Sequence, residues 1–144
     1  MRLRHLALSL VLTGLAACAT NAPVKPAANL SPEAAITQRI TERWQHIIDR
    51  DYKAAYEYLT PGTRAVMPYP DYEMRLRQAQ ILWKGSTVKQ ITCDDAETCH
   101  AEVQLDIVVL MPGAGIGATP TISVVNESWL KTGNQWYFLP TKIR

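Results

Sequence analysis

Three polar residues that could transfer protons share one face of a predicted strand. His100, Glu102 and Asp106 lie an even number of positions apart within residues 99–110, and such positions point to one side of a strand. A histidine among carboxylates is a candidate general acid or base. The opposite face is apolar: Ala101, Val103, Leu105, Ile107 and Val109. Because an apolar face is better suited to cover a core, we expect the polar face to be solvated or at an interface, and we assign no catalytic residue.

Aromatic side chains and a second histidine are candidates for ligand contact. Trp44 and His46 lie in the first predicted helix, and Tyr52, Tyr56 and Tyr72 lie in the shorter helices that follow. Together they could line the mouth of a pocket and stack on a ligand. The alternative is simple packing for the tyrosines and a half-buried structural role for His46.

Two cysteines enclose a short polar turn. Cys93 and Cys99 flank turn-forming residues, and β-type residues lie outside them. This pattern predicts a hairpin whose last facing pair is the two cysteines, which suits a disulfide. A redox-active pair would favour Cys-x-x-Cys at a helix start, and a metal site would need Asp94, His100 and others to converge. We expect a structural disulfide, with metal, redox and free-thiol roles as alternatives, and we assign no metal or cofactor.

The N-terminal segment has the features of a targeting signal. Two arginines precede an apolar run over residues 6–15, which is too short to span a bilayer. The run leads into Leu-Ala-Ala-Cys at residues 15–18. The segment resembles a bacterial lipoprotein signal peptide, which implies that residues 1–17 are removed and that Cys18 is acylated. Membrane lipid is then a partner of the protein, and a plain secretory signal with an incidental Cys18 is the alternative.

The residues after Cys18 bear on where the protein goes. Ala19, not Asp, follows the cysteine, and by resemblance to enterobacterial sorting this favours the outer membrane over the inner one, with the domain in the periplasm. Residues 18–30 combine the lipidated cysteine with a proline- and alanine-rich flexible tether. The folded domain is then expected over residues 31–144.

Removal of the signal peptide changes the charge balance. The chain of 144 residues, the length of one domain, carries 15 Lys and Arg against 13 Asp and Glu. Residues 1–17 include Arg2 and Arg4, so 15 less 2 leaves 13 positive side chains against 13 negative ones. A neutral mature chain without a run of Lys or Arg gives no reason to expect nucleic-acid binding.

Helical signals fill the first half of the domain. Ser31 is a candidate N-cap and Pro32 a candidate first helical residue. Apolar residues then recur at helical spacing over residues 32–49. The polar residues between them are expected to face water: Gln38, Arg39, Glu42, Arg43 and Gln45.

Shorter helices are expected to follow the first one. Asp51, Thr60 and Asp71 are candidate caps for three of them. The helix that starts at Asp71 is expected to extend to Leu82 or Trp83, which would complete its buried stripe.

Strand signals fill the second half of the domain. The expected strands cover residues 86–93, 99–110, 121–131 and 135–143. The glycine-rich segment 111–119 connects strand to strand, so it does not fit a phosphate-binding loop. We expect it to be a flexible hairpin tip that serves as a pocket lid or partner contact. Helices followed by an antiparallel meander indicate an α+β fold.

The order of these elements resembles the NTF2-like (cystatin-like, α+β cone) superfamily. The resemblance rests on Arg43-Trp44, Asp49-Arg50-Asp51-Tyr52, Ala55-Tyr56, Leu59-Thr60-Pro61 and the final Trp136-Tyr137-Phe138-Leu139-Pro140. It implies N-terminal helices packed on a curved four-stranded antiparallel sheet, with a pocket between the sheet and the long helix. Members include steroid isomerases, polyketide cyclases and dehydratases, and others bind ligands or proteins or pair through their sheets.

These observations favour a membrane-anchored, periplasm-facing lipoprotein that acts as a ligand-binding or protein-assembly module. A small apolar ligand, a second copy of the chain or an envelope protein would be the partner. The alternatives are a pocket enzyme of isomerase or dehydratase type and a structural accessory of an envelope complex. No hydrolase, zinc-protease or Walker motif occurs in the sequence.

Overall fold

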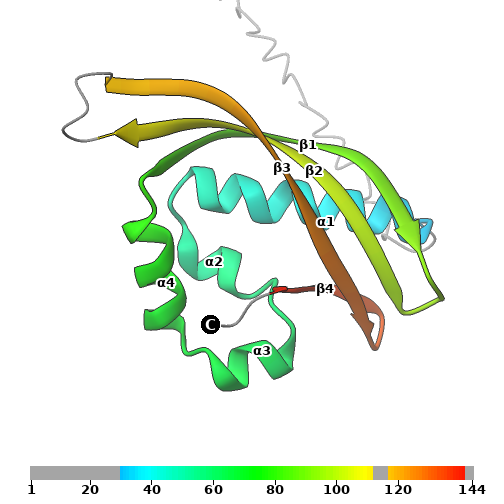
Figure 1. Ribbon diagram of the computed structural model, residues 1–144. Coiled ribbons are helices and arrows are strands. Elements are labelled where there is room, and N and C mark those ends of the chain that lie inside the picture. Colours follow the sequence, from blue (N-terminus) through cyan, green and yellow to red (C-terminus); the bar gives the residue numbers. More distant parts are fainter. Residues whose placement is uncertain (1–29, 112–116, 142–144) are drawn as a thin grey trace, which may run out of the picture.

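Helices precede strands along the part of the chain that the computed structural model describes, residues 30–111 and 117–141. The predicted signal peptide, Cys18, most of the tether and the centre of the glycine-rich segment lie outside the described residues. The elements are α1 (Pro32–Ile48), α2 (Tyr52–Tyr56), α3 (Pro61–Val66), α4 (Tyr69–Gln78), β1 (Ile81–Cys93), β2 (Thr98–Met111), β3 (Gly117–Thr132) and β4 (Gln135–Leu139) (Figure 1). No helix in this part of the chain has the length and apolar character needed to cross a bilayer.

The ends of α1 follow from local hydrogen bonding. At its start, the Ser31 hydroxyl accepts a hydrogen bond from the Ala34 amide at 3.2 Å, which satisfies one of the free donors of the first turn. At its end, the Asp51 amide donates to the His46 carbonyl at 2.8 Å, and the Arg50 amide donates to the Ile47 carbonyl at 3.1 Å. This pair of bonds is a Schellman motif, and it places Arg50 in the left-handed region with φ 63°.

Two of the three predicted caps of the short helices are confirmed, and the third is wrong. The side chains of Asp51 and Thr60 accept hydrogen bonds from backbone amides at the starts of α2 and α3, as expected. The predicted start of α4 was wrong, because the helix begins at Tyr69 after Pro68 and Asp71 lies in its first turn. The amides of a first helical turn have no acceptor within the helix, so a proline there removes no hydrogen bond, and Pro70 does not interrupt α4.

The boundary between α4 and β1 is also a correction. The helix ends at Gln78, and β1 begins at Ile81, not at residue 86. Leu82 and Trp83, expected in the helix, instead pair with Val108 and Ile107 of β2. These side chains suit a half-buried sheet as well as a helix, and the long β2 strand provides the partner that decides between them.

The strands form an antiparallel meander in the order β1-β2-β3-β4. Its first hairpin closes on the facing pair Cys93 and Cys99, which form the predicted disulfide. β3 is longer than expected and β4 is shorter. The Phe138 amide donates to the Tyr58 carbonyl at 2.7 Å, and the Thr60 amide donates to the Phe138 carbonyl at 3.0 Å. β4 is therefore tied to the segment between α2 and α3.

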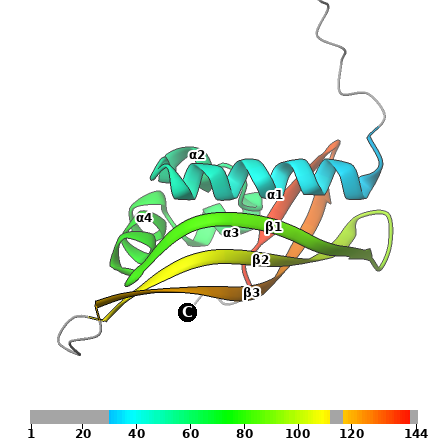
Figure 2. The same ribbon diagram turned by 90° about the horizontal axis from the view of Figure 1, so that it is seen from above.

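The sheet curves around α1, and the other helices cover one end of the concave side (Figure 2). Two register shifts in β1, between Trp83 and Gly85 and between Val88 and Gln90, bend this edge strand. At Gly85 an added Cβ would lie 3.0 Å from the Asp106 carboxylate, so the absence of a side chain allows this close approach. The predicted fold class is confirmed as α+β: N-terminal helices pack on a curved four-stranded antiparallel sheet, consistent with the NTF2-like cone.

Candidate functional site

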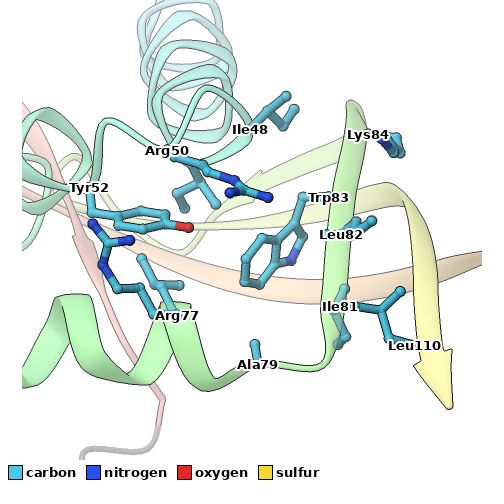
Figure 3. Close-up of a pocket in the computed structure, with 12 residues that line it drawn as sticks. Ile48, Arg50, Tyr52, Arg77, Ala79, Ile81, Leu82, Trp83, Lys84 and Leu110 are labelled. Carbon is cyan, nitrogen blue, oxygen red and sulfur yellow. The ribbon is translucent and has the colours of Figure 1, made fainter. Parts of the chain in front are cut away.

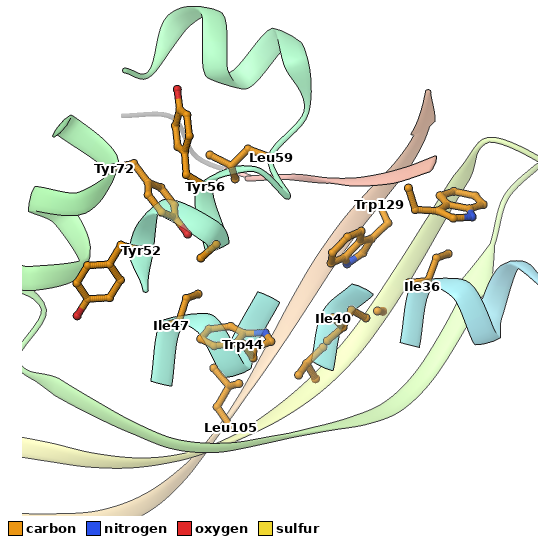
Figure 4. Packing of buried hydrophobic residues seen from close by; sticks show 14 of the residues in the cluster. Ile36, Ile40, Trp44, Ile47, Tyr52, Tyr56, Leu59, Tyr72, Leu105 and Trp129 are labelled. Carbon is orange, nitrogen blue, oxygen red and sulfur yellow. The ribbon is translucent and has the colours of Figure 1, made fainter. Parts of the chain in front are cut away.

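The middle of the concave side is filled by side chains (Figure 4). Ile36, Ile40, Trp44 and Ile47 of α1 belong to one core cluster with inward residues of β2 and β3, where Trp129 is completely buried. Tyr52, Tyr56, Leu59, Tyr72 and Leu105 extend this core toward the helical end. The space that a ligand could occupy therefore has to be sought at the margins of the core.

A buried ion pair lies in this core and corrects the prediction that Arg43 faces water. Arg43 and Glu127 are 5% and 3% exposed, and an Arg43 guanidinium nitrogen lies 2.9 Å from Glu127 Oε1. The indole nitrogens of Trp44 and Trp129 also donate to this carboxylate, at 2.9 and 3.0 Å. Three donors compensate the desolvation of the carboxylate, which is buried away from solvent.

The position of Arg43 follows from the curvature of the sheet. Its guanidinium lies over the Phe138 ring at 3.9 Å from the centroid, so β4 covers a face of α1 that helical spacing alone assigns to solvent. Arg39 is likewise half-buried, and its Nε donates to the Trp136 carbonyl at 2.9 Å. Burial lowers the pKa of Arg39. Both arginines were expected in water because a helical pattern does not reveal a second layer of covering chain.

Two polar atoms beside this ion pair have no hydrogen-bond partner within the described residues. They are the Arg43 Nε and the Tyr72 hydroxyl. Burial raises the pKa of Tyr72, and the nearby Arg43 guanidinium opposes the shift. The tyrosine is therefore kept in its neutral form, as a core residue.

A cavity of about 350 Å³ opens beyond the core, between the C-terminal end of α1, α4 and the first residues of β1. We call it the end cavity. Figure 3 shows the rings of Tyr52 and Trp83 on either side of it, with Arg50 between them. It is lined by Ile47, Ile48, Arg50, Tyr52, Leu76, Arg77, Ala79, Ile81, Leu82, Trp83, Lys84 and Leu110.

The lining combines aliphatic and aromatic side chains with cationic ones, and polar atoms contribute much of its exposed surface. The Arg77 Nε donates to the Glu73 carboxylate at 2.8 Å, which raises the pKa of Arg77 and lowers the pKa of Glu73. Arg50 and Lys84 make no ion pair with any described carboxylate. A cavity of this composition can bury an apolar body and hold a negative group at its edge.

The residues predicted to line one pocket lie in different parts of the structure. Tyr52 belongs to the core and also lines the end cavity, whereas Trp44, Tyr56 and Tyr72 are core residues outside its lining. The Tyr56 hydroxyl donates to the Met67 carbonyl at 2.9 Å. His46 lines a separate surface depression beside Tyr58, with its Nδ1 3.8 Å from an Asp51 carboxylate oxygen.

The polar face of β2 points away from the helices, as expected. His100, Glu102 and Asp106 are all exposed, and His100 contacts neither of the other two within hydrogen-bonding range. Its Nε2 lies 3.0 Å from an Asp94 carboxylate oxygen, and its Nδ1 lies 3.2 Å from the Ser128 hydroxyl. These contacts have the order found in hydrolytic triads, but they lie on the solvated face of the sheet, where water screens the charges that such a mechanism needs. Within the described residues, no three metal-ligating side chains converge.

The sequence reasoning missed most residues of the end cavity. Arg50 entered only as part of a family pattern, Trp83 was expected in a helix, and Lys84 fell between the expected helix and the strand expected from residue 86. The signal for Glu127 was present, because it alternates with Val125 and Trp129 and so falls on the inward face of β3. Arg50 could have been noticed because it directly follows the predicted first helix, at the position where a glycine usually ends a helix.

Comparison with known proteins supports the fold and does not extend to the chemistry. No protein-family model matches the chain, and no curated protein matches it in sequence. A SEC-C motif protein from Rhodopseudomonas palustris aligns with a TM-score of 0.53 and 17% identity over 75% of this chain and 74% of that one. A SEC-C motif protein from Psychrobacter arcticus aligns with a TM-score of 0.55 and 12% identity over 81% and 65%.

A further similar structure is the protein Aln2 from a Streptomyces species. It aligns with a TM-score of 0.53 and 13% identity, and the match covers 76% of this chain and 88% of that chain. At these identities the similarity is one of fold, and function has to be argued from the site itself.

Proposed function

We propose that the protein is a lipid-anchored, periplasm-facing binding module that holds a small molecule with an apolar body in the end cavity. The observation that carries this proposal is a cavity of about 350 Å³, lined by two aromatic rings, aliphatic side chains and polar groups, beside a core that is otherwise filled. Its volume lies at the lower end of the range usual for small-molecule sites. Tyr52 and Trp83 supply rings on which a ligand can pack.

The same lining supports binding more than turnover. Its titratable members are Arg50, Tyr52, Arg77 and Lys84, and no described lining residue is a carboxylate or a histidine. An isomerase or dehydratase needs a group that accepts a proton near the ligand at working pH. The inward carboxylate, Glu127, is occupied by three donors. A pocket enzyme is therefore the weaker alternative.

A protein-assembly role is a second candidate, supported by the outer face of the sheet. Ile122 and Val124 of β3 are 62% and 55% exposed. They pair with Asp106 and Gln104 of β2, and Val108 and Pro120 extend the apolar area on one side only. An exposed pair of this kind is small for a stable interface, which ranks assembly behind ligand binding.

The test uses the mature chain, residues 18–144, with Cys18→Ser to prevent acylation and export to the periplasm to form the disulfide. Binding of N-phenylnaphthylamine, a neutral fluorescent probe, is measured for this chain and for Ala79→Trp, which fills the end cavity. Ala65→Trp, at an exposed position of α3, is the control. We expect Ala79→Trp alone to abolish binding. Equal binding by all three chains would place the probe elsewhere and contradict the proposal.

Native mass spectrometry of the same preparation separates the two candidate roles. A retained small molecule that is absent from Ala79→Trp supports the binding module. A dimer without a retained molecule, lost on Val124→Lys, would support assembly through the sheet instead.

A further inference from the structure

The lining of the end cavity contains cationic residues but no carboxylate among the described residues, although the predicted mature chain has no net charge. Three of its lining residues are the cations Arg50, Arg77 and Lys84, and no carboxylate is among the described residues that line it. Arg77 is paired with Glu73. The positive charges left unpaired among the described lining residues are therefore those of Arg50 and Lys84, and a neutral ligand gives no reason for them. The charge therefore bears on the identity of the ligand.

Arg50 provides the strongest observation because its backbone conformation is unfavourable. It has φ 63° at the position after the α1 C-cap, where glycine is the usual residue because it lacks a Cβ. Residues held in this region against their preference are concentrated at functional sites. Figure 3 shows the Arg50 guanidinium between the rings of Tyr52 and Trp83.

The three cations differ in how far they are neutralised. Arg77 is bonded to Glu73 at 2.8 Å, and its guanidinium lies 5.3 Å from the centroid of the Tyr52 ring. The charge of Arg77 is therefore largely neutralised by Glu73, and the main effect of Arg77 is to hold the Tyr52 ring in place. Arg50 has no ion-pair partner among the described carboxylates, so its guanidinium retains its full capacity to bind an anion.

We propose that the ligand of the end cavity is an amphipathic anion, whose carboxylate, sulfonate or phosphate group is held by Arg50 while its apolar body lies between Tyr52 and Trp83. This inference rests on the proposed binding function and specifies its ligand class. Arg50 binds the anionic group through charge-assisted hydrogen bonds in the fixed geometry of a guanidinium. Lys84, at the rim on β1, adds attraction at longer range.

The test compares two probes that share one apolar body. Anilinonaphthalenesulfonate carries a sulfonate, and N-phenylnaphthylamine does not. Both are titrated into the mature chain with Cys18→Ser and into its Arg50→Gly variant. Because glycine suits the left-handed conformation, Arg50→Gly removes the cation without disrupting the end of α1. Lys131→Ala is the matched control, because it removes one positive charge at the opposite end of the sheet.

We expect Arg50→Gly to weaken sulfonate binding about tenfold or more and to leave neutral-probe binding within about twofold of its original value. Lys131→Ala should change neither. The melting temperature of Arg50→Gly should equal or exceed that of the parent chain, which shows that any loss of binding is not a loss of folding.

Each other outcome has a definite meaning. If neither probe binds the parent chain, the proposed binding function fails. If both probes bind equally and Arg50→Gly changes neither, the cavity binds ligands and the anion inference is overturned. If Arg50→Gly and Lys131→Ala weaken sulfonate binding equally, the effect comes from net charge, and Arg50 has no specific role.

Competition with decanoate, decyl phosphate and decanol then defines the anionic group. The two anions should displace the sulfonate probe at lower concentration than the alcohol of the same chain length. Vesicles of phosphatidylglycerol, which present phosphate only in a bilayer, should compete poorly if the ligand is a free amphiphile. Competition by the vesicles alone would contradict a free ligand.

Discussion

At the scale of single residues, the buried pair of Arg43 and Glu127 shows how polar groups are accommodated in this core. The carboxylate receives donors from Arg43, Trp44 and Trp129, which lie on two different elements. A buried ion pair of this kind adds little net stability over apolar packing, but removal of one partner leaves an uncompensated charge. The pair therefore fixes the register of α1 against β3 more than it contributes free energy.

Removal of the carboxylate should be costly. We expect Glu127→Leu to lower the free energy of unfolding by about 3–5 kcal/mol, because it leaves Arg43 buried without a counter-charge. Glu127→Gln retains one acceptor for the indole donors and should cost less. Urea denaturation measures both. A double-mutant cycle with Arg43→Met should give a coupling of about 0.5–3 kcal/mol, and a coupling of zero would show that the pair does not act as a unit.

Tyr72 should make stability depend on alkaline pH. Burial raises its pKa in the folded state, so the unfolded chain loses the proton first, once the pH passes the ordinary tyrosine pKa of about 10. The contribution of Tyr72 to the free energy of unfolding is fully present below this pH. It is lost as the pH rises through the pKa of Tyr72 in the folded state. We expect Tyr72→Phe to lessen this decline, as measured by urea denaturation from neutral pH to about pH 11.

The neutral-pH arm of this experiment provides the control. The Tyr72 hydroxyl has no hydrogen-bond partner within the described residues, so Tyr72→Phe should not destabilise the fold at pH 7. Tyr56→Phe removes a hydroxyl that bonds to the Met67 carbonyl at 2.9 Å and should cost about 1 kcal/mol. If Tyr72→Phe costs as much, its hydroxyl is satisfied and the assignment is wrong.

At the scale of elements, a disulfide joins β1 and β2 at the end of the first hairpin. Cys93 and Cys99 face each other at the end of the β1–β2 ladder, and Cys99 is completely buried beside Trp129. The disulfide therefore holds the end of an edge strand that has two register shifts and would otherwise fray.

Reduction of this disulfide should destabilise the domain modestly. The closed loop is short, with a sequence separation of 6, and loop entropy then predicts a loss of about 2 kcal/mol. The measurement is urea denaturation with and without a phosphine reductant, with thiol titration to follow the reaction. Cys93→Ala with Cys99→Ala is the control and should not respond to reductant. An equal response of both chains would mean that the reductant acts elsewhere.

At the scale of the whole molecule, acylation of Cys18, if it occurs as we propose, would hold the domain and its end cavity near a membrane. Its helices and sheet enclose one core, and the cavity opens at the end where α1 and α4 approach β1. A tether of a dozen residues would keep that opening within a short distance of the lipid. A cavity for an amphipathic anion in this position would be close to a source of such molecules.

Anchoring depends on a single predicted modification. We expect the full-length protein to partition with membranes and into the detergent phase, and Cys18→Ser to become soluble, because the acyl chains carry the membrane affinity. Intact mass should show the lipid on Cys18. Cys93→Ala with Cys99→Ala should remain in the membrane fraction. A wild-type protein recovered in the aqueous phase without added mass would support the plain secretory alternative.

The sequence by itself determined the elements whose causes are local. Ser31, Asp51 and Thr60 cap their helices as expected, since a cap is set by residues within one turn. The alternation in residues 99–110 correctly predicted which face of β2 is buried. The facing cysteines of the first hairpin were predicted for the same reason, because hairpin register depends on neighbouring residues.

Only the tertiary structure decided the questions that depend on what covers an element. Whether Arg43 faces water depends on β4, which lies far along the chain, and whether Trp83 is helical depends on its partner in β2. The end cavity is formed where α1, α4 and β1 converge, so no single segment of the sequence contains it. Burial is a property of contacts between distant residues, and a one-dimensional pattern records only the preference of each residue for it.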